Sequence, residues 1–376
     1  MGAPRVPSPL DRFYSVIPAG GIGSRLWPLS RADAPKFLHD LTGSGSSLLR
    51  ATWERLAPLS GEQRIMVVTG RAHRAAVEEQ IPELADPNIV LESEPRDSSA
   101  AIGLAAAILA RREPDVIIGS FAADHVIGDT AKFSAAVREA VHAADAGHIV
   151  AIGIEPTEPA IGFGYIECGE PVTVTGAPSA RAVVSFVEKP DRATAERYVA
   201  DGMHLWNAGM FIARADRLLD QMRRSEPALV AGLEELAAAW DDPATRGPAV
   251  DRIWPGLRKI AIDYSVAEPA AAAGRMVVVP GEFDWDDVGD FAAIAKLQSG
   301  GRKSDLVILG ENARVLADAS SGIVVGQSDR IISLIGVQDI VVVDTPDALL
   351  VTTKANAQRV KSVVDALKLS GRSEVL

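Results

Sequence analysis

A glycine-rich segment near the N-terminus combines a backbone suited to phosphate with two basic side chains. It reads Ala19-Gly20-Gly21-Ile22-Gly23-Ser24-Arg25-Leu26, and a lysine follows in Ala34-Pro35-Lys36-Phe37. Glycine lets an anion approach the chain closely, and successive N–H groups can bind phosphate oxygens. Arg25 and Lys36 would add mobile positive charge over a triphosphate. We therefore interpret this stretch as a nucleotide-binding loop, formed by Ala19, Gly20, Gly21, Gly23, Ser24, Arg25 and Lys36.

The loop differs from the two common phosphate-binding patterns. Leu26 stands where G-x-G-x-x-G requires its last glycine, and the Gly-Lys-Ser/Thr ending of a P-loop is missing. A nicotinamide-dependent oxidoreductase is therefore disfavoured. Taken alone, glycines after a strand are equally consistent with a plain tight turn. The basic residues Arg25, Arg31 and Lys36 favour phosphate.

Two acidic segments offer ligands for a metal ion. Asp124 follows the apolar run Val116–Gly119, and Asp284, Asp286 and Asp287 surround Trp285. Proteins usually hold Mg2+ with one or two carboxylates together with phosphate oxygens, and the ion neutralises charge at a reacting phosphorus. From position alone, a helix or turn cap is the simpler interpretation of Asp124, and a solvated turn that of the second segment.

Three further segments place polar groups beside glycines or at strand ends. They are Gly162-Phe163-Gly164-Tyr165-Ile166, Phe186-Val187-Glu188-Lys189-Pro190 and Trp206-Asn207-Ala208-Gly209-Met210-Phe211. Glu188 could accept hydrogen bonds from sugar hydroxyls, and Lys189 could bind a sugar phosphate. Asn207 precedes a predicted small-residue turn that would suit a hydroxyl. Each segment alone is also consistent with an ordinary solvated surface.

Together, in this order, the segments resemble the sugar-1-phosphate nucleotidyltransferases. The run Ala-Gly-Gly-x-Gly-x-Arg-Leu-Trp-Pro-Leu-Ser-Arg followed by Pro-Lys-Phe is similar to the family signature. Trp27, Ser30 and Arg31 make it most similar to the mannose-1-phosphate guanylyltransferases. The resemblance implies Mg2+-dependent in-line attack of mannose 1-phosphate on the α-phosphorus of GTP, giving GDP-mannose and pyrophosphate. No protein nucleophile is implied, because positioning and electrostatics supply the catalysis.

The resemblance also assigns roles to single residues. Arg25, Lys36 and Asp124 are expected to be catalytic. Asp124 and Asp287 are expected to bind Mg2+, although Asp286 stands where serine is common and stays an alternative ligand. The expected sugar-phosphate residues are Gly164, Tyr165, Glu188, Lys189 and Asn207.

Base recognition is implied only by family likeness. Arg96 and Ser98 lie in a segment similar to the family's Arg-Asn-Thr-Ala-Pro loop and are expected at the nucleotide. Asp97, Ser98 and Ser99 depart from that pattern. Guanine is therefore expected from the family and not from these side chains.

Composition restricts the partners and the compartment. The chain has 376 residues, 47% of them hydrophobic, and a formal net charge of −12 without a long basic block, which disfavours nucleic acid. The single cysteine, Cys168, excludes an intrachain disulfide, suits a reducing cytosol and is interpreted as a half-buried strand residue. Met1–Arg12 lacks a signal-peptide pattern, and no run is long enough to span a membrane. We expect a cytoplasmic protein.

Short apolar runs alternate with helical patterns through the first two-thirds of the chain. This predicts a doubly wound α/β fold with a mostly parallel sheet, in which ligands bind at the carboxyl ends of the strands. The predicted helices are Ala100–Arg112, with Ser98 or Ser99 as N-cap, and Ala131–Ala146. The predicted strands are Tyr14–Ile17, Ile65–Thr69, Ile89–Leu91, Val116–Gly119, Ile149–Ile154 and Val183–Val187.

Beyond Gly300–Ser304, which is interpreted as a linker, the pattern changes to closely spaced β-branched runs. These are Ile323–Val325, Ile331–Ile335, Ile340–Val343 and Leu349–Val351, and a helix is predicted over Asn356–Leu367. We expect a catalytic domain at residues 1–298 and a small left-handed β-helix-like domain with a terminal helix at 299–376. Relatives that also isomerise mannose 6-phosphate carry a longer cupin-like C-terminal region, so that activity is not expected.

Two alternatives stay open. The chain could perform the same chemistry with another nucleotide or hexose, or it could be a non-catalytic, nucleotide-sugar-binding regulatory protein. The retained Lys36, Asp124 and Asp287 disfavour the regulatory alternative. No pair of the six histidines has zinc-ligand spacing, so we interpret them as structural. A homodimer is expected from the family.

Overall fold

The larger part of the chain is built around one nine-stranded sheet. The computed structural model describes residues 8–300, 302, 305–310 and 313–376, so most of the expected linker and most of the N-terminal segment 1–12 lie outside the described residues. The strands are, in spatial order, β3 (Ile89–Glu92), β2 (Ile65–Gly70), β1 (Phe13–Ala19), β4 (Ile117–Ser120), β9 (His204–Arg214), β6 (Ile149–Ile154), β10 (Met276–Gly281), β8 (Arg181–Glu188) and β7 (Gly164–Pro171).

The sheet is mixed in direction. The four strands β3, β2, β1 and β4 are parallel, as are β6 and β10, whereas β9 runs antiparallel to both β4 and β6. The turn predicted around Ala208 and Gly209 is wrong, because these residues lie inside β9. Gly209 has a positive φ of 66°, and the pairing register with β6 shifts between Ala151 and Gly153. A β-bulge therefore replaces the expected turn and re-aims the side chains beside it.

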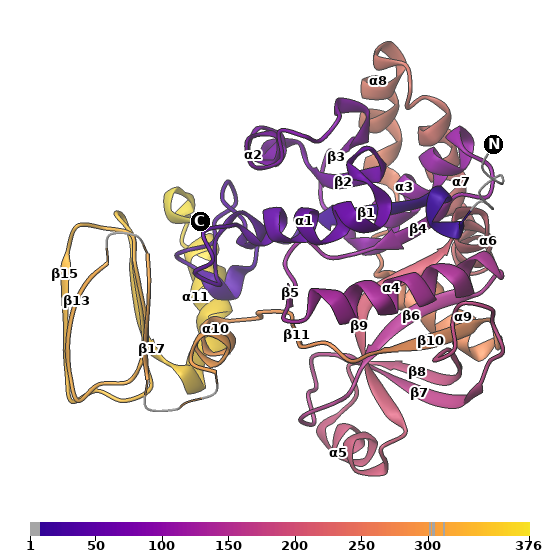
Figure 1. Cartoon of the computed structure of the whole chain (residues 1–376). Helices are drawn as coiled ribbons and strands as arrows, with labels where there is room; N and C mark the ends of the chain where they lie inside the picture. Colours follow the sequence, from indigo (N-terminus) through magenta and orange to yellow (C-terminus); the bar gives the residue numbers. More distant parts are fainter. Residues whose placement is uncertain (1–7, 301, 303–304, 311–312) are drawn as a thin grey trace, which may run out of the picture.

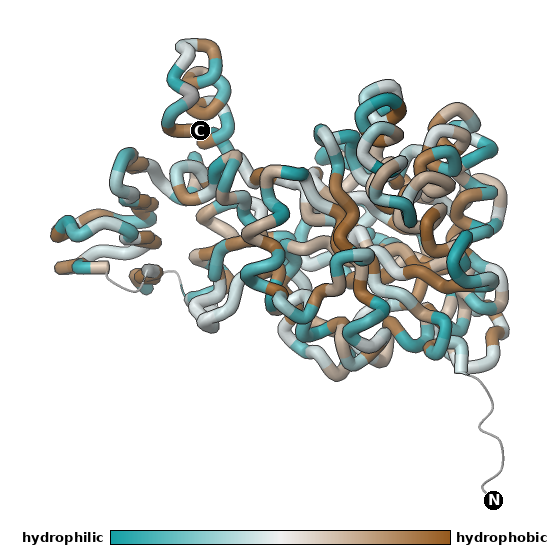
Figure 2. Tube along the Cα trace, turned by 90° about the horizontal axis from the view of Figure 1, so that it is seen from above, coloured by the Kyte–Doolittle hydropathy of each residue, from teal (hydrophilic) through white to brown (hydrophobic). Residues whose placement is uncertain are grey.

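Helices cover both faces of this sheet (Figure 1). One face packs on α1 (Leu48–Ser60), α2 (Arg74–Gln80), α4 (Thr130–Asp145) and α5 (Arg192–Asp201). The other packs on α3 (Asp97–Arg112), α6 (Ala215–Ser225), α7 (Pro227–Ala238), α8 (Pro243–Ile253) and α9 (Glu268–Ala272). Figure 2 shows the apolar strand segments running through the middle of this unit. Among the described residues, no helix is both long and apolar enough to cross a membrane.

Helix α3 starts earlier than the sequence predicts. It begins at Asp97, and neither Ser98 nor Ser99 is its N-cap, so that prediction is wrong. The Ser98 hydroxyl instead accepts the backbone N–H of Ile262 at 2.9 Å, and the Ser99 hydroxyl is 2.7 Å from that of Ser265. These serines tie the helix start to a distant segment, because that contact satisfies a buried N–H group.

The C-terminal unit is a coil of short strands that pair in parallel, except for the last one, which is antiparallel to its neighbour. Its strands alternate between two sheets, one formed by β12 (Leu306–Leu309), β14 (Gly322–Gly326), β16 (Ile340–Asp344) and β17 (Leu349–Thr353), the other by β13 (Arg314–Asp318) and β15 (Ile331–Ile335). The strand pattern of the sequence did not predict β12 and β13. The last helix, α11, spans Val360–Leu369, and a 3-10 turn over Lys354–Arg359 replaces the start predicted at Asn356.

This coil packs against the segment that follows the glycine-rich loop. Leu26, Trp27 and Leu29 share a hydrophobic core with helix α10 (Phe291–Gln298) and with apolar side chains of β14 and β16. The Trp27 indole N–H donates to the backbone oxygen of Val375 at 2.6 Å, and Arg31 pairs with Asp347 at 2.7 Å. The C-terminal unit therefore supports the loop region of the larger unit.

The coil depends on a glycine at position 322. Gly322 has a φ of 135°, and a Cβ there would lie 2.0 Å from the backbone oxygen of Ile340. We predict that Gly322→Ala lowers the free energy of unfolding by about 3 kcal/mol or more, because a backbone atom cannot move aside. Gly336 is the matched control, since it also has a positive φ, of 67°, but no atom lies within 4 Å of its Cβ position.

Gly336→Ala should lower the free energy of unfolding by only about 1–2 kcal/mol, because only the left-handed backbone conformation disfavours alanine there. Urea unfolding of both variants measures the difference. Equal losses would show that steric contact with β16 does not constrain the coil.

Candidate active site

The glycine-rich loop leaves β1 at the carboxyl edge of the sheet. Gly20 and Gly21 are exposed, and the 3-10 turn η2 (Ser24–Leu26) carries Arg25. Gly23 has a φ of 74°, and a Cβ there would lie 2.6 Å from the Cβ of Lys36. Any larger residue at this position would displace Lys36. The loop conformation and the position of Lys36 are therefore fixed together.

Lys36 connects the loop to both predicted metal ligands. Its Nζ lies 2.9 Å from Oδ2 of Asp124 and also donates to the backbone oxygen of Asp287. Only 7% of the lysine side chain is exposed. Burial by itself raises the pKa of Asp124, but the charge and the hydrogen bond of Lys36, together with smaller contributions from its other neighbours, outweigh burial and hold that pKa below its ordinary value. Asp124 is thus a carboxylate ready for a cation.

The two candidates for the second metal ligand have different partners. Asp286 uses its Oδ1 to accept the backbone N–H of Val288 at 2.6 Å, so it closes a turn. The Cβ position of Gly289 lies 3.5 Å from Oδ1 of Asp287 and 3.6 Å from Nη1 of Arg25, which places Asp287 beside the loop. Burial raises the pKa of Asp287, and Lys36 opposes that rise.

A metal ion at this site would need ligands from the substrate. Among the described residues, no group of three or more His, Cys, Asp and Glu side chains is arranged to hold one. The Asp287 carboxylate accepts no hydrogen bond from the described residues, and Asp124 accepts one from Lys36. Two carboxylates with free oxygens fit an ion that takes its other ligands from phosphate and water.

His125 lies beside Asp124 without taking part in this cluster. Burial lowers its pKa to about 4, so the ring is neutral at physiological pH. The ring packs edge-on against Trp285, with centroids 5.4 Å apart, and Arg55 donates to the His125 backbone oxygen at 3.3 Å. Because burial suppresses its charge and its ring packs against Trp285, His125 acts as a packing residue.

Polar side chains from β8, β9 and a π-helical turn meet at the same edge of the sheet. Nδ2 of Asn207 donates to Oδ1 of Asp263 at 2.8 Å, and Lys189 pairs with Glu188 at 2.7 Å. A Cβ at Gly164 would lie 2.5 Å from Oε2 of Glu188, so this glycine makes room for the carboxylate. The set offers acceptors for hydroxyl groups and one exposed cation for a phosphate.

Asp263 was not predicted from the sequence as a site residue. It begins the π-helical turn η8 (Asp263–Ala267), a rare element that no periodicity in the sequence predicts. Burial and the nearby Glu188 raise the pKa of Asp263 to about 6. A buried carboxyl group of this kind, held by Asn207, is a candidate ligand for a substrate hydroxyl.

The structure separates Tyr165 from this group. Tyr165 is fully buried, and its hydroxyl donates to the backbone oxygen of Ala160 at 2.9 Å. Its ring packs in the core on the α4 face of the sheet, whereas its neighbour Gly164 faces Glu188. Successive strand residues point to opposite faces, so the Tyr165 side chain points away from the cluster.

Arg96 and Ser98 also have structural partners. Arg96 donates to the backbone oxygens of Leu257, at 3.2 Å, and of Pro255. Together with the contact between Ser98 and Ile262, these bonds hold the segment that leads into Asp263. Both residues therefore position the sheet edge, because the Nη groups of Arg96 and the hydroxyl of Ser98 bond to neighbouring backbone groups.

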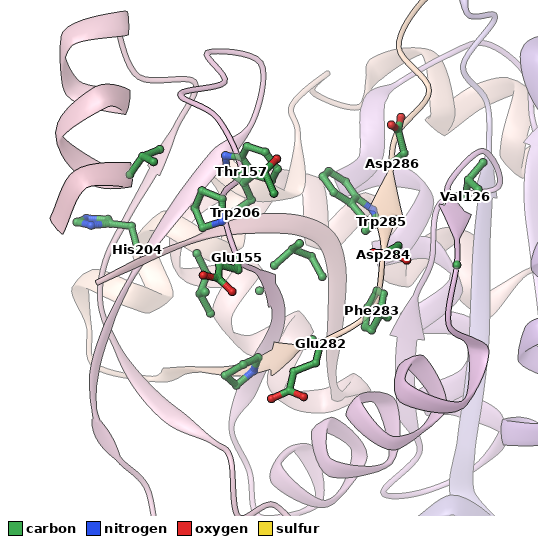
Figure 3. Close-up of a pocket in the computed structure, with 18 of the residues that line it drawn as sticks. Val126, Glu155, Thr157, His204, Trp206, Glu282, Phe283, Asp284, Trp285 and Asp286 are labelled. Atoms are coloured by element: carbon green, nitrogen blue, oxygen red, sulfur yellow. The ribbon is translucent and has the colours of Figure 1, made fainter. Parts of the chain in front are cut away.

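A cavity of about 1010 Å³ lies next to this site, between β9, α5 and β11 (Trp285–Asp286) (Figure 3). Trp206, Trp285 and Phe283 form much of its wall, with Glu155 and Glu282 among the polar side chains. Of the residues predicted to bind substrate or metal, only the alternative ligand Asp286 is among its described lining residues. Trp206 and Asn207 point to opposite faces of β9, so this cavity and the Asn207 cluster are distinct.

Comparisons with known proteins agree with this architecture. The family profile described as "Nucleotidyl transferase" matches residues 14–303, and a second, "MannoseP isomerase/GMP-like beta-helix domain", matches residues 312–367. The predicted nucleotidyltransferase fold with a β-helix-like C-terminal unit is confirmed. Family members of this kind generally use a divalent metal.

Relatives extend over nearly the whole chain. The xanthan biosynthesis protein XanB of Xanthomonas campestris is 38% identical over 96% of this chain and 74% of its own length. The mannose-1-phosphate guanylyltransferase of Escherichia coli is 36% identical over 97% of this chain and 75% of its own length. A crystal structure from Thermus thermophilus, described as a mannose-1-phosphate geranyltransferase, has a TM-score of 0.83 and 33% identity over 95% of this chain and 99% of its own.

The matched region therefore includes both units of the fold and the segments that carry Lys36, Asp124 and Asp287. A resemblance limited to the sheet would show only a fold, whereas identity above 30% across both units shows common descent in one enzyme family. This chain belongs to the nucleotidyltransferases, and among them to the mannose-1-phosphate guanylyltransferase family.

Proposed function

We propose that the chain transfers GMP from GTP to α-D-mannose 1-phosphate, giving GDP-mannose and pyrophosphate, with Mg2+ as the metal. The observation that carries the proposal is the contact of Lys36 with Asp124 and with the backbone of Asp287, beside Arg25 and the glycine-rich loop. This arrangement offers basic groups and metal-binding carboxylates at one place. The names of the E. coli, Klebsiella and Salmonella relatives support the two substrates.

Asp124 and Asp287 would hold the metal ion. When bound there, Mg2+ would neutralise negative charge on the reacting phosphates. Hard carboxylate oxygens suit Mg2+, and free oxygens on both side chains leave room for phosphate ligands. Asp286 is the weaker candidate, because its Oδ1 already accepts a backbone N–H.

The residues of the chain would then orient the two substrates. Arg25 and Lys36 would bind oxygens of the triphosphate, Lys189 would bind the sugar phosphate, and Glu188, Asn207 and Asp263 would accept or donate to sugar hydroxyls. The attacking atom is a phosphate oxygen that already carries negative charge, so the reaction needs no general base. The lowered pKa of His125, about 4, makes its ring a weak base, which is consistent with a reaction that needs none.

Pyrophosphate release in the presence of Mg2+ tests the proposal. GTP, ATP, UTP and dTTP are crossed with the 1-phosphates of mannose, glucose, galactose and N-acetylglucosamine. Turnover confined to GTP with mannose 1-phosphate is the expected result. Preference for another pair would assign a different nucleotide-sugar pyrophosphorylase, and no turnover by a protein that binds nucleotide would favour the regulatory alternative. The homodimer and the cytoplasmic location stay predictions.

The assignment of the second metal ligand is tested by two matched variants. Asp287→Asn should lower kcat/KM at limiting Mg2+ by about 100-fold, because it removes a charged ligand. Asp286→Asn should stay within about fivefold of the parent enzyme, since the amide oxygen of asparagine can still accept the N–H of Val288. Titration of activity with Mg2+ measures both, and the reverse ranking would make Asp286 the ligand.

The raised pKa of Asp263 predicts a pH effect on sugar binding. As the pH falls through about 6, Asp263 gains a proton and loses acceptor strength, so KM for mannose 1-phosphate should rise. Asp263→Asn should raise that KM about tenfold at pH 8 and leave KM for GTP unchanged.

The same variant is the control for titration of the substrate. The sugar phosphate itself takes up a proton near pH 6. Asp263→Asn keeps this substrate effect and removes the contribution of the protein, so its KM should change less steeply between pH 8 and pH 5.5. Identical pH profiles for the two proteins would exclude Asp263 from sugar binding.

A further inference from the structure

Three arginine side chains line a second cavity, at the edge of the sheet opposite to the glycine-rich loop. The cavity has a volume of about 310 Å³, and Arg217, Arg224 and Arg275 lie in its wall together with His148. His148 and Arg275 directly precede β6 and β10, which are neighbouring parallel strands. The six residues of β10 rise about 3.3 Å each, so the cavity lies about 20 Å from the carboxyl edge. A ligand in it would not touch the substrates.

Helix α6 carries two of the arginines on one face. Arg217, Gln221 and Arg224 are spaced by four and three positions, so their side chains lie one above another along the helix. Gln221 is only 4% exposed, and Nη1 of Arg275 donates to its Oε1 at 3.2 Å. The buried amide thus holds Arg275 against this face. Helix α6 and the segment before β10 therefore bring three guanidinium groups to one cavity.

Close acidic partners are lacking for these three groups within the part of the chain that the structure describes. Arg224 has neither an ion pair nor a side-chain hydrogen bond there, and the side chain of Arg275 bonds only the neutral Gln221. Nε of Arg217 is 4.0 Å from Oδ2 of Asp216, an oxygen that lies 3.0 Å from the guanidinium of Arg214. Their positive charge is therefore largely uncompensated.

Arg223, next to them on the same helix, shows the usual arrangement of an arginine in this chain. It pairs with Asp220 at 2.5 Å and with Glu234 at 2.7 Å. Asp220 is the only acidic residue among the described lining residues of the cavity, and this pair already engages it. The chain has 50 acidic and 38 basic residues, so acids are not scarce. Three guanidinium groups around one cavity repel one another, and a bound anion would remove that repulsion.

The chemistry of the lining selects the kind of anion. A guanidinium group presents paired N–H donors that match the oxygens of phosphate. The volume is at the lower end of the range for small-molecule sites, which suits a phosphate group with a small substituent. We propose that Arg217, Arg224 and Arg275 bind a doubly charged phosphate group, either as the inorganic ion or as part of pyrophosphate or of a phosphorylated sugar.

Helices α6 and α9 connect this cavity to the sugar site. Helix α6 ends at Ser225, whose hydroxyl donates to the backbone oxygen of Ser265 in the π-helical turn that begins with Asp263. The turn leads directly into α9, and the backbone N–H of Arg275 donates to the oxygen of Ala270 in α9 at 2.9 Å. A phosphate that bridges α6 and Arg275 would therefore hold the turn from both ends. The bound anion acts as an effector that stabilises Asp263, and this role rests on the proposed function, in which Asp263 binds the sugar.

Calorimetric titration with pyrophosphate, without Mg2+, tests the site without turnover. The active site and the cavity should both bind it in the parent protein. The double variant Arg217→Gln and Arg224→Gln removes two charges from exposed positions of α6 and keeps good helix formers. It should bind one pyrophosphate fewer per chain, or bind the second at least about tenfold more weakly.

Arg252→Gln is the matched control, because it removes an exposed arginine of α8 that pairs with Glu235 at 2.7 Å. Its binding should equal that of the parent. Unchanged binding by the double variant, or an equal loss in the control, overturns the proposal. Inorganic phosphate and glucose 6-phosphate, titrated in the same way, identify the source. The ligand is the one of the three probes whose affinity depends most strongly on Arg217 and Arg224.

Hydrogen exchange measures the connection to the sugar site. Phosphate should slow exchange of the backbone amides of residues 263–275 about threefold or more in the parent and in the control, but not in the double variant. Phosphate should also raise KM for mannose 1-phosphate at least about twofold less in the parent, since competition at the active site affects both proteins equally. Equal exchange in the two proteins overturns the effector role. A protein whose exchange responds but that makes no GDP-mannose overturns only the proposed function.

Discussion

A buried lysine holds three distant segments of the chain together at the carboxyl edge of the sheet. Lys36 is stable there only because its charge is paired, with Asp124 after β4 and with the backbone oxygen of Asp287 after β11. Gly23 makes room for it, since a side chain at that position would collide with its Cβ. Loss of one partner would leave a buried charge unpaired. The contacts of Lys36 therefore constrain three segments together: the glycine-rich loop, the segment after β4 that carries Asp124, and the turn after β11 that carries Asp287.

The C-terminal coil extends this constraint beyond the sheet. The family signature includes Trp27 and Arg31, yet both residues contact the C-terminal unit. Trp27 donates to the backbone of Val375, and Arg31 pairs with Asp347. The signature is thus longer than a phosphate-binding loop requires, because its second half is an interface. Distortion of the coil would reach the glycine-rich loop through this apolar contact.

The sequence predicted best what is local. Strand β6 follows from its apolar run, whereas the joint roles of Lys36, Asp124 and Asp287 were expected from the family resemblance and not from their positions alone. Three features depend on tertiary structure instead. Tyr165 points away because successive residues of β7 alternate between the two faces of the sheet and Gly164 faces Glu188. Ser98 bonds a residue 164 positions away, and Asp263 lies in a π-helical turn without a sequence signal.

The balance of charge at the sheet edge explains why an enzyme of this kind needs a divalent cation. Four carboxyl groups and three basic side chains lie at this edge of the sheet. They are Asp124, Asp287, Glu188 and Asp263 with Arg25, Lys36 and Lys189. Two anionic substrates must bind among them. Burial and the nearby Glu188 reduce the negative charge, since they raise the pKa of Asp263 to about 6. The rest can be neutralised only by positive charge from solution, and the carboxylates with free oxygens, Asp124 and Asp287, lie where the phosphates would meet.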